Sequence, residues 1–141
     1  MKLRALASAL ILLATSSPAD DRCIATYGTN GSEVFFTNCK RPVAADNRAR
    51  VVRMVRFPID IMIAGNRTHL KNRSELLKYY DVAFDPKVKG FIGTQKFEDL
   101  FCNWQGVMIG RGEIWVDDVG KPPTLKITAI NNNPPWSPGH N

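Results

Sequence analysis

Residues 72–92 read NRSELLKYYDVAFDPKVKGFI and contain two successive helix-start signals. Asn72 followed by Glu75 is a capping-box pattern, which predicts a helix over about residues 73–84. Asp85-Pro86 then ends this helix and begins a second one, with Asp85 as its N-cap. One face of the first helix is apolar at helical spacing and consists of Leu76, Tyr80, Ala83 and Phe84. The centre of the chain is therefore predicted to hold two short helices.

Strand patterns flank these helices on both sides. Residues 51–63 (VVRMVRFPIDIMI) carry apolar side chains of one parity, although Pro58 within them indicates a sheet edge or a bulge. Residues 106–116 are β-prone and contain three glycines, which fits either a hairpin or one long bulged strand. Residues 125–130 form the last predicted strand, with Leu125, Ile127 and Ala129 facing inward. The order predicts an α+β fold, an antiparallel sheet with two short helices packed on one face.

The N-terminal part, residues 20–45, is predicted to be a hairpin followed by a connector. Cys23 and Cys39 bracket two β-prone runs around the Gly-Thr-Asn-Gly-Ser sequence of residues 28–32, and Asn-Gly favours a tight turn. Three cysteines allow three single pairings. Because hairpin arms bring their ends together, we expect a Cys23–Cys39 disulfide and a single, buried Cys102. No CxxC motif is present and no His lies within helical reach of a cysteine, so we expect no metal site.

Residues 1–19 (MKLRALASALILLATSSPA) have the features of a secretory signal: a basic start, a short apolar stretch and small residues before the cleavage point. The apolar stretch is shorter than the roughly 20 residues of a membrane span, so we expect none. The chain is thus predicted to be exported to the periplasm or outside the cell, where a disulfide persists. We expect residues 46–133 to form the α+β core, as one domain with residues 20–45. Residues 134–141 are predicted to be a flexible, Pro-rich tail.

The charge is mildly basic. The chain has 141 residues and a net charge of +6, and loss of Lys2 and Arg4 with the signal leaves 17 basic against 13 acidic side chains, or +4. This excess is small for a dedicated nucleic-acid binder, so we expect no specific binding of nucleic acid. It suits attraction to an acidic protein or an anionic component of the cell envelope.

One candidate binding surface combines a tryptophan with charged residues. Trp and Arg are enriched at binding hot spots, and the candidate residues are Trp115, Arg111, Glu113, Lys126, Arg53 and Arg56. The alternative is that Trp115 packs on the core and that the charges are solvated. Arg53 lies on an otherwise apolar strand pattern. It is either buried beside a carboxylate such as Glu113 or Asp81, or turned outward by a bulge.

A catalytic site is a weaker reading. His69 and Glu113 would serve as base and acid of a small secreted ribonuclease, with Arg53 or Arg111 for the phosphate. His69 follows a polar turn, where a solvated histidine is the usual finding. The glycines of residues 106–112 are not followed by a helix start, so they do not form a phosphate loop, and we expect no cofactor.

Three segments carry a family resemblance: residues 74–81 (SELLKYYD), 101–115 and 125–131. Their order over residues 51–131 resembles small exported proteins of the NTF2-like or cystatin-like kind. The resemblance implies a curved antiparallel sheet against helices. That fold hosts enzymes and binding modules alike.

These observations favour a small exported, non-catalytic binding protein. A more specific form of this hypothesis is an inhibitor or an immunity-type module. The alternatives are a secreted hydrolase that uses His69 and Glu113, and a small-ligand carrier with a pocket between the helices and the sheet.

Overall fold

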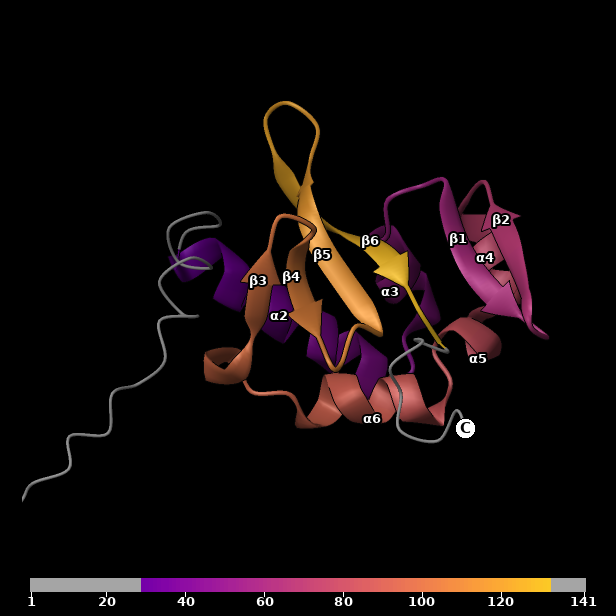
Figure 1. Ribbon diagram of the computed structural model, residues 1–141, viewed down its shortest axis with the longest axis horizontal. Helices are drawn as coiled ribbons and strands as arrows, with labels where there is room; N and C mark the ends of the chain where they lie inside the picture. The colour runs from indigo at the N-terminus through magenta and orange to yellow at the C-terminus, as the bar shows by residue number, and fades with distance from the viewer. Residues whose placement is uncertain (1–28, 133–141) are drawn as a thin grey trace, which may run out of the picture.

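The structure, a computed structural model, describes residues 29–132 and has a mixed α+β architecture (Figure 1). The helices are α2 (Thr29–Ala44), α3 (Arg48–Arg53), α4 (Arg73–Lys78), α5 (Tyr80–Ala83) and α6 (Pro86–Thr94), with a 3₁₀ turn at Phe97–Asp99. The strands are β1 (Ile59–Ile63), β2 (Asn66–Leu70), β3 (Phe101–Asn103), β4 (Gly106–Ile109), β5 (Ile114–Val119) and β6 (Thr124–Ile130). The α+β class predicted from the sequence is confirmed.

The strands form two antiparallel sheets. β3, β4, β5 and β6 follow one another in a four-stranded meander, and β1 and β2 form a separate hairpin. The chain just before the hairpin joins them, because the Arg56 amide donates to the Ile127 carbonyl and the Ile127 amide donates to the Met54 carbonyl, both at 2.8 Å. β1 also contacts β6. The hairpin therefore lies against the open edge of the meander, as Figure 1 shows.

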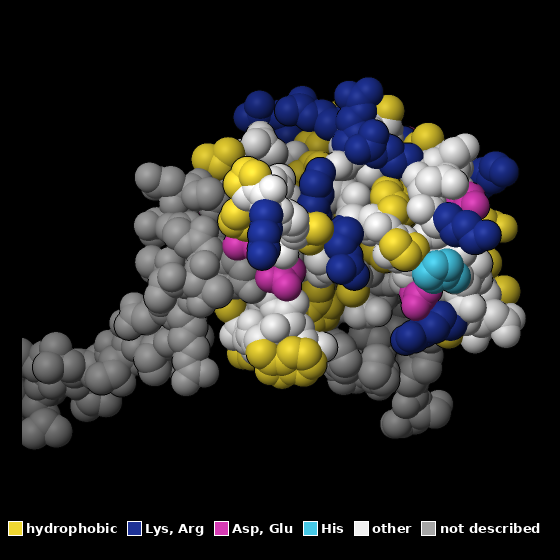
Figure 2. Space-filling model, turned by 90° about the horizontal axis from the view of Figure 1, so that it is seen from above, with side chains coloured by type: hydrophobic (Ala, Val, Ile, Leu, Met, Phe, Trp, Pro, Cys, Tyr) yellow, Lys and Arg dark blue, Asp and Glu magenta, His cyan; other side chains and the backbone are white. Residues whose placement is uncertain are grey.

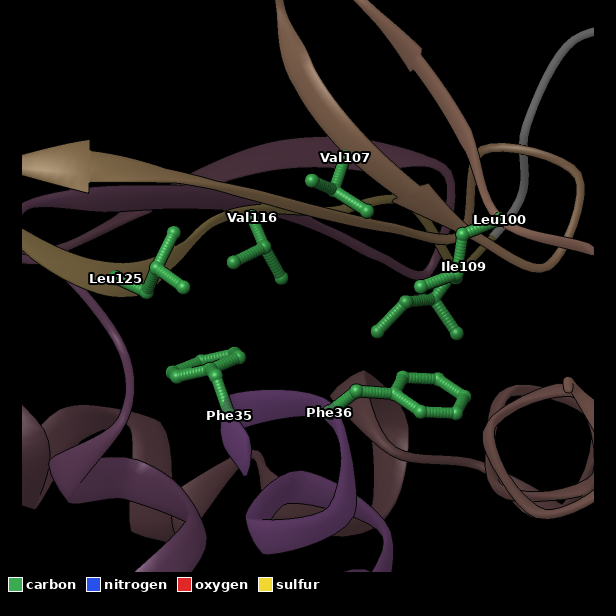
Figure 3. Close-up of a pocket in the computed structure, with 7 residues that line it drawn as sticks. All are labelled: Phe35, Phe36, Leu100, Val107, Ile109, Val116 and Leu125. Carbon is green, nitrogen blue, oxygen red and sulfur yellow. The ribbon is translucent and has the colours of Figure 1, made fainter. Parts of the chain in front are cut away.

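The core lies between α2 and the four-stranded sheet. Phe35 and Phe36 of α2 point toward Val107, Val116 and other apolar side chains of the sheet (Figure 3). The space left between these side chains is only about 10 Å³, roughly the minimum that one water molecule requires. A small-ligand pocket occupies about 300 Å³ or more. This interface is therefore a packed core and not the pocket expected of a carrier.

The central helices agree with the sequence. The Asn72 side chain accepts a hydrogen bond from the Glu75 amide at 3.0 Å, and the Asp85 side chain accepts one from the Val88 amide at 2.8 Å. All four residues of the predicted apolar face are fully buried: Leu76, Tyr80, Ala83 and Phe84. The predicted helix is interrupted at Tyr79, which separates α4 from α5.

The N-terminal hairpin predicted from the sequence is wrong, because residues 29–44 form α2. Phe36, Cys39 and Val43 are buried at positions i, i+3 and i+7, so packing of one helical face outweighs the local turn and strand propensities. Cys39 is buried with a free thiol, which rules out the Cys23–Cys39 disulfide. Cys102 is not a free cysteine, so the prediction of a single Cys102 is also wrong. Cys23 lies outside the described residues, as do the predicted signal and the tail.

The strand predicted over residues 51–63 is correct only in its second half. Asn47 caps α3 by accepting a hydrogen bond from the Arg50 amide at 3.1 Å, and the neighbouring residues Val51 and Val52 are both buried in this helix. β1 begins directly after Pro58, which has no amide hydrogen to donate to a ladder. Arg53 ends α3 and is exposed, so it is not a buried arginine that requires a carboxylate.

Of the two readings of residues 106–116, the hairpin is correct, because β4 and β5 pair around the turn that includes Gly110 and Gly112. A register shift instead occurs between β5 and β6, where Thr128 is the extra residue opposite the junction of Trp115 and Val116. The shift changes which face the following residues occupy. Ile127 and Ile130 are consequently the fully buried residues of β6, and the predicted inward position of Ala129 is wrong.

Candidate functional site: a basic groove

The β1–β2 hairpin places polar side chains on one face. Ala64 and Gly65 connect the strands with φ angles of 50° and 78°, the left-handed backbone of a tight two-residue hairpin turn. This turn sets Asp60 opposite His69 and Met62 opposite Arg67. Because side chains alternate along a strand, Asp60, Arg67 and His69 share the exposed face. The opposite face is apolar and contributes Ile59, Ile61 and Leu70 to the core.

A groove of about 370 Å³ lies between this hairpin and the end of β6. One wall holds Arg56 and the three polar residues of the hairpin, and the other wall holds Thr128, Ala129 and Asn131. The groove falls in the volume range of small-ligand sites. Charged side chains from separate segments of the chain converge in this groove.

The groove has more basic than acidic groups. His69 Nδ1 lies 2.8 Å from Asp60 Oδ1, and Arg67 Nη1 lies 3.8 Å from Asp60 Oδ2. Asp60 is thus the acidic member, and two basic residues already contact it. Within residues 29–132, the Arg56 guanidinium forms no ion pair that would compete with a ligand. The arrangement therefore leaves a positive site for an anion.

Three of the predicted binding residues meet beside this groove. Arg56 lines it, and the Lys126 ammonium donates to the Arg53 carbonyl at 2.9 Å. The pairing of Arg56 with Ile127 holds this segment next to β6. We call Arg53, Arg56 and Lys126 the basic rim. In Figure 2, Lys and Arg side chains gather along one edge of the molecule, and acidic and basic side chains surround a histidine.

The other predicted binding residues lie elsewhere. Trp115 is only 8% exposed, so it is not the exposed tryptophan of the predicted patch, and it is not a member of the main core cluster either. Glu113 is fully buried in the β4–β5 turn, and its carboxylate accepts a hydrogen bond from the Arg111 amide. Arg111 itself is exposed and contacts the Phe91 ring.

The His69–Glu113 pair of the hydrolase reading is not assembled. His69 is exposed on β2 and bonded to Asp60, whereas the Glu113 side chain closes a buried turn and does not line the groove. A general acid and base must reach one substrate position together. Glu113 is instead a structural carboxylate of the β4–β5 turn.

Two charged residues of the groove are not apparent as site residues from the sequence alone. Asp60 and Arg67 were not singled out, although the turn at residues 64–65 pairs positions 60 and 69 by counting outward from it. A third residue that the sequence did not indicate is Trp104 in the β3–β4 turn, which at 89% is the most exposed large apolar side chain within residues 33–132. Nothing in the spacing of its neighbours distinguishes it from a buried aromatic residue.

In the described part of the chain, no group of three His, Cys, Asp or Glu side chains is placed to hold a metal ion. Among the helices of residues 29–132, none has the length and apolar character needed to cross a membrane.

No family model, curated protein or solved structure matches this chain. The NTF2-like or cystatin-like resemblance therefore stays a prediction, and the functional argument depends on the site alone.

Proposed function

We propose that the chain is a small exported, non-catalytic binding protein that recognises an acidic protein or an anionic component of the cell envelope. The observation that carries this proposal is the groove beside the β1–β2 hairpin, in which Arg56 and Arg67 face one space with His69. Arg53 and Lys126 extend the positive charge along the basic rim. An inhibitor or immunity-type role is the form of this function in which the partner is a protein.

The two alternatives have less support. A hydrolase that uses His69 and Glu113 needs both side chains at one substrate position, and Glu113 is buried outside the groove. A carrier needs a pocket between helices and sheet, and the apolar space there is about 10 Å³. Binding at the surface requires neither a catalytic pair nor an apolar pocket. It uses the charged residues that line the groove and the basic rim.

The test is an affinity capture from an envelope extract with the oxidised mature domain as bait. A bound partner should be lost from Arg53→Gln/Arg56→Gln and should elute at raised salt, because screening weakens contacts between exposed charges. Arg41→Gln/Lys96→Gln is the matched control, since it removes the same charge from two exposed residues outside the groove. Equal capture by the two double variants would overturn the proposal.

A further inference from the structure

We infer that the groove recognises a phosphate group, held by Arg56, Arg67 and His69. This inference rests on the proposed function and names the chemistry of the ligand. Arg56 belongs to the segment paired with β6, whereas Arg67 and His69 belong to β2. The donors thus reach the same space from two separate parts of the fold.

The number of donors and their different origins favour phosphate over carboxylate. A carboxylate offers about four lone-pair sites, all in one plane, and a bidentate guanidinium occupies two of them. A phosphate has additional oxygens in a tetrahedral arrangement, so it accepts from a second guanidinium and from an imidazole as well. The groove offers these three donors, and its volume leaves room for part of the molecule that carries the phosphate.

The contact with Asp60 determines which ring nitrogen of His69 is available to a phosphate. An ionised aspartate is only an acceptor, so His69 Nδ1, at 2.8 Å from Asp60 Oδ1, carries a hydrogen. In a neutral ring the other nitrogen, Nε2, is then an acceptor and repels a phosphate oxygen. In the protonated ring Nε2 is a donor. A phosphate oxygen at Nε2 is therefore contacted by a donor only when the ring is protonated, beside the charged groups Asp60, Arg56 and Arg67.

The experiment is isothermal titration calorimetry of the mature domain with inorganic phosphate, a short polyphosphate and a short polyglutamate. We expect polyphosphate to bind more tightly than polyglutamate of the same charge. His69→Gln should weaken polyphosphate binding, because a neutral amide replaces the imidazole donor.

Arginine variants test the geometry. Arg56→Gln and Arg67→Gln should each weaken polyphosphate binding about tenfold or more, because each removes a charge-assisted contact. Arg56→Lys should recover only part of the affinity, since an ammonium keeps the charge but not the planar fork. Arg41→Gln, on α2, should bind like the wild type.

Vesicles of phosphatidylglycerol, compared with vesicles of neutral lipid, distinguish a lipid headgroup from a soluble phosphate as the source. Binding of neither phosphate source, equal binding of polyglutamate, or binding unchanged in Arg56→Gln and Arg67→Gln would overturn the inference. A partner captured from the extract that polyphosphate does not displace would overturn it while the proposed binding function stands.

Discussion

His69 and Asp60 face each other across the β1–β2 hairpin, with His69 Nδ1 2.8 Å from Asp60 Oδ1 and both side chains partly exposed. The pair is placed by the register of the two-residue turn, so it connects the local backbone geometry to the charge of the groove.

We expect the pair to contribute modestly to stability. A double-mutant cycle with His69→Gln and Asp60→Asn, measured by urea unfolding, should give a coupling energy of about 0.2–1 kcal/mol, typical of exposed cross-strand ion pairs. The coupling should decrease at high salt. Strictly additive effects of the two substitutions at low salt would contradict the observed contact.

Two glycines should respond to alanine in opposite directions. Gly106 has a φ of +116°, and a Cβ atom there would clash with the Val116 carbonyl oxygen, so Gly106→Ala should cost about 2 kcal/mol or more. Gly90 lies in α6 with open space around it, so Gly90→Ala should stabilise by about 0.5–1 kcal/mol. Thermal and urea unfolding of both variants provide the measurement, and each is the control for the other.

The buried Cys39 predicts a loss of stability at alkaline pH. Burial raises the pKa of the Cys39 thiol from its usual 9.0 to about 12, so between these values the unfolded chain releases a proton that the folded chain retains. The free energy of unfolding should therefore be unaffected by this thiol below about pH 9, and should fall above it by up to about 1.4 kcal/mol per pH unit. Cys39→Ala should remove the decline between pH 9 and 10.

Burial also raises the pKa of Tyr80 to about 12, with the Asp46 carboxylate a smaller cause, so a tyrosine contribution of the same sign begins near pH 10. A Cys39→Ala variant that declines as steeply as the wild type from pH 9 would contradict the assignment to the thiol.

Thiol titration tests which cysteines pair. Because Cys39 is buried and free while Cys102 is not free, we predict that a disulfide joins Cys102 to Cys23. We expect no reaction with a thiol reagent in the folded protein, and one reactive thiol per chain in denaturant without reductant. Peptide mapping should place that thiol at Cys39. Reaction of Cys23 or Cys102 in its place would contradict the pairing.

The two tryptophans should differ sharply in their effect on folding. Trp115→Ala removes a side chain that is 8% exposed and should cost about 3–5 kcal/mol, whereas Trp104→Ala removes one that is 89% exposed and should change stability by less than about 0.5 kcal/mol. Urea unfolding measures both. A loss of partner binding in Trp115→Ala would therefore report on folding, and Trp104→Ala is the informative substitution for a role of an exposed aromatic side chain.

Local signals in the sequence located the middle of the fold. Asn72 and Asp85 cap their helices as predicted, because a capping hydrogen bond joins residues three apart and needs nothing from the rest of the chain. The prediction for the N-terminal region was wrong because Cys39 and its apolar neighbours are arranged by contact with α6 and the sheet. The local sequence also does not indicate that Thr128 is an extra residue in β6, since a bulge is defined by the pairing with the partner strand.

For the site, the sequence supplied individual residues but not their arrangement. Arg53, Arg56 and Lys126 were expected to bind a partner, and they lie together through the pairing of residues 54–56 with β6. Glu113 was grouped with His69 because both are titratable, although one is buried and the other exposed. Burial of a single carboxylate depends on packing against residues far away in the chain, which spacing alone does not report.

The walls of the groove come from residues 56–69 and residues 128–131, which are separated by all of the central helices and three strands. A molecule held across both walls therefore bridges the first hairpin and the final strand. Amide hydrogens of β1, β2 and β6 should exchange with solvent more slowly when the groove is occupied, because opening either wall would require release of the ligand. The exchange rates of the amides in β1, β2 and β6 would thus report whether the groove is occupied.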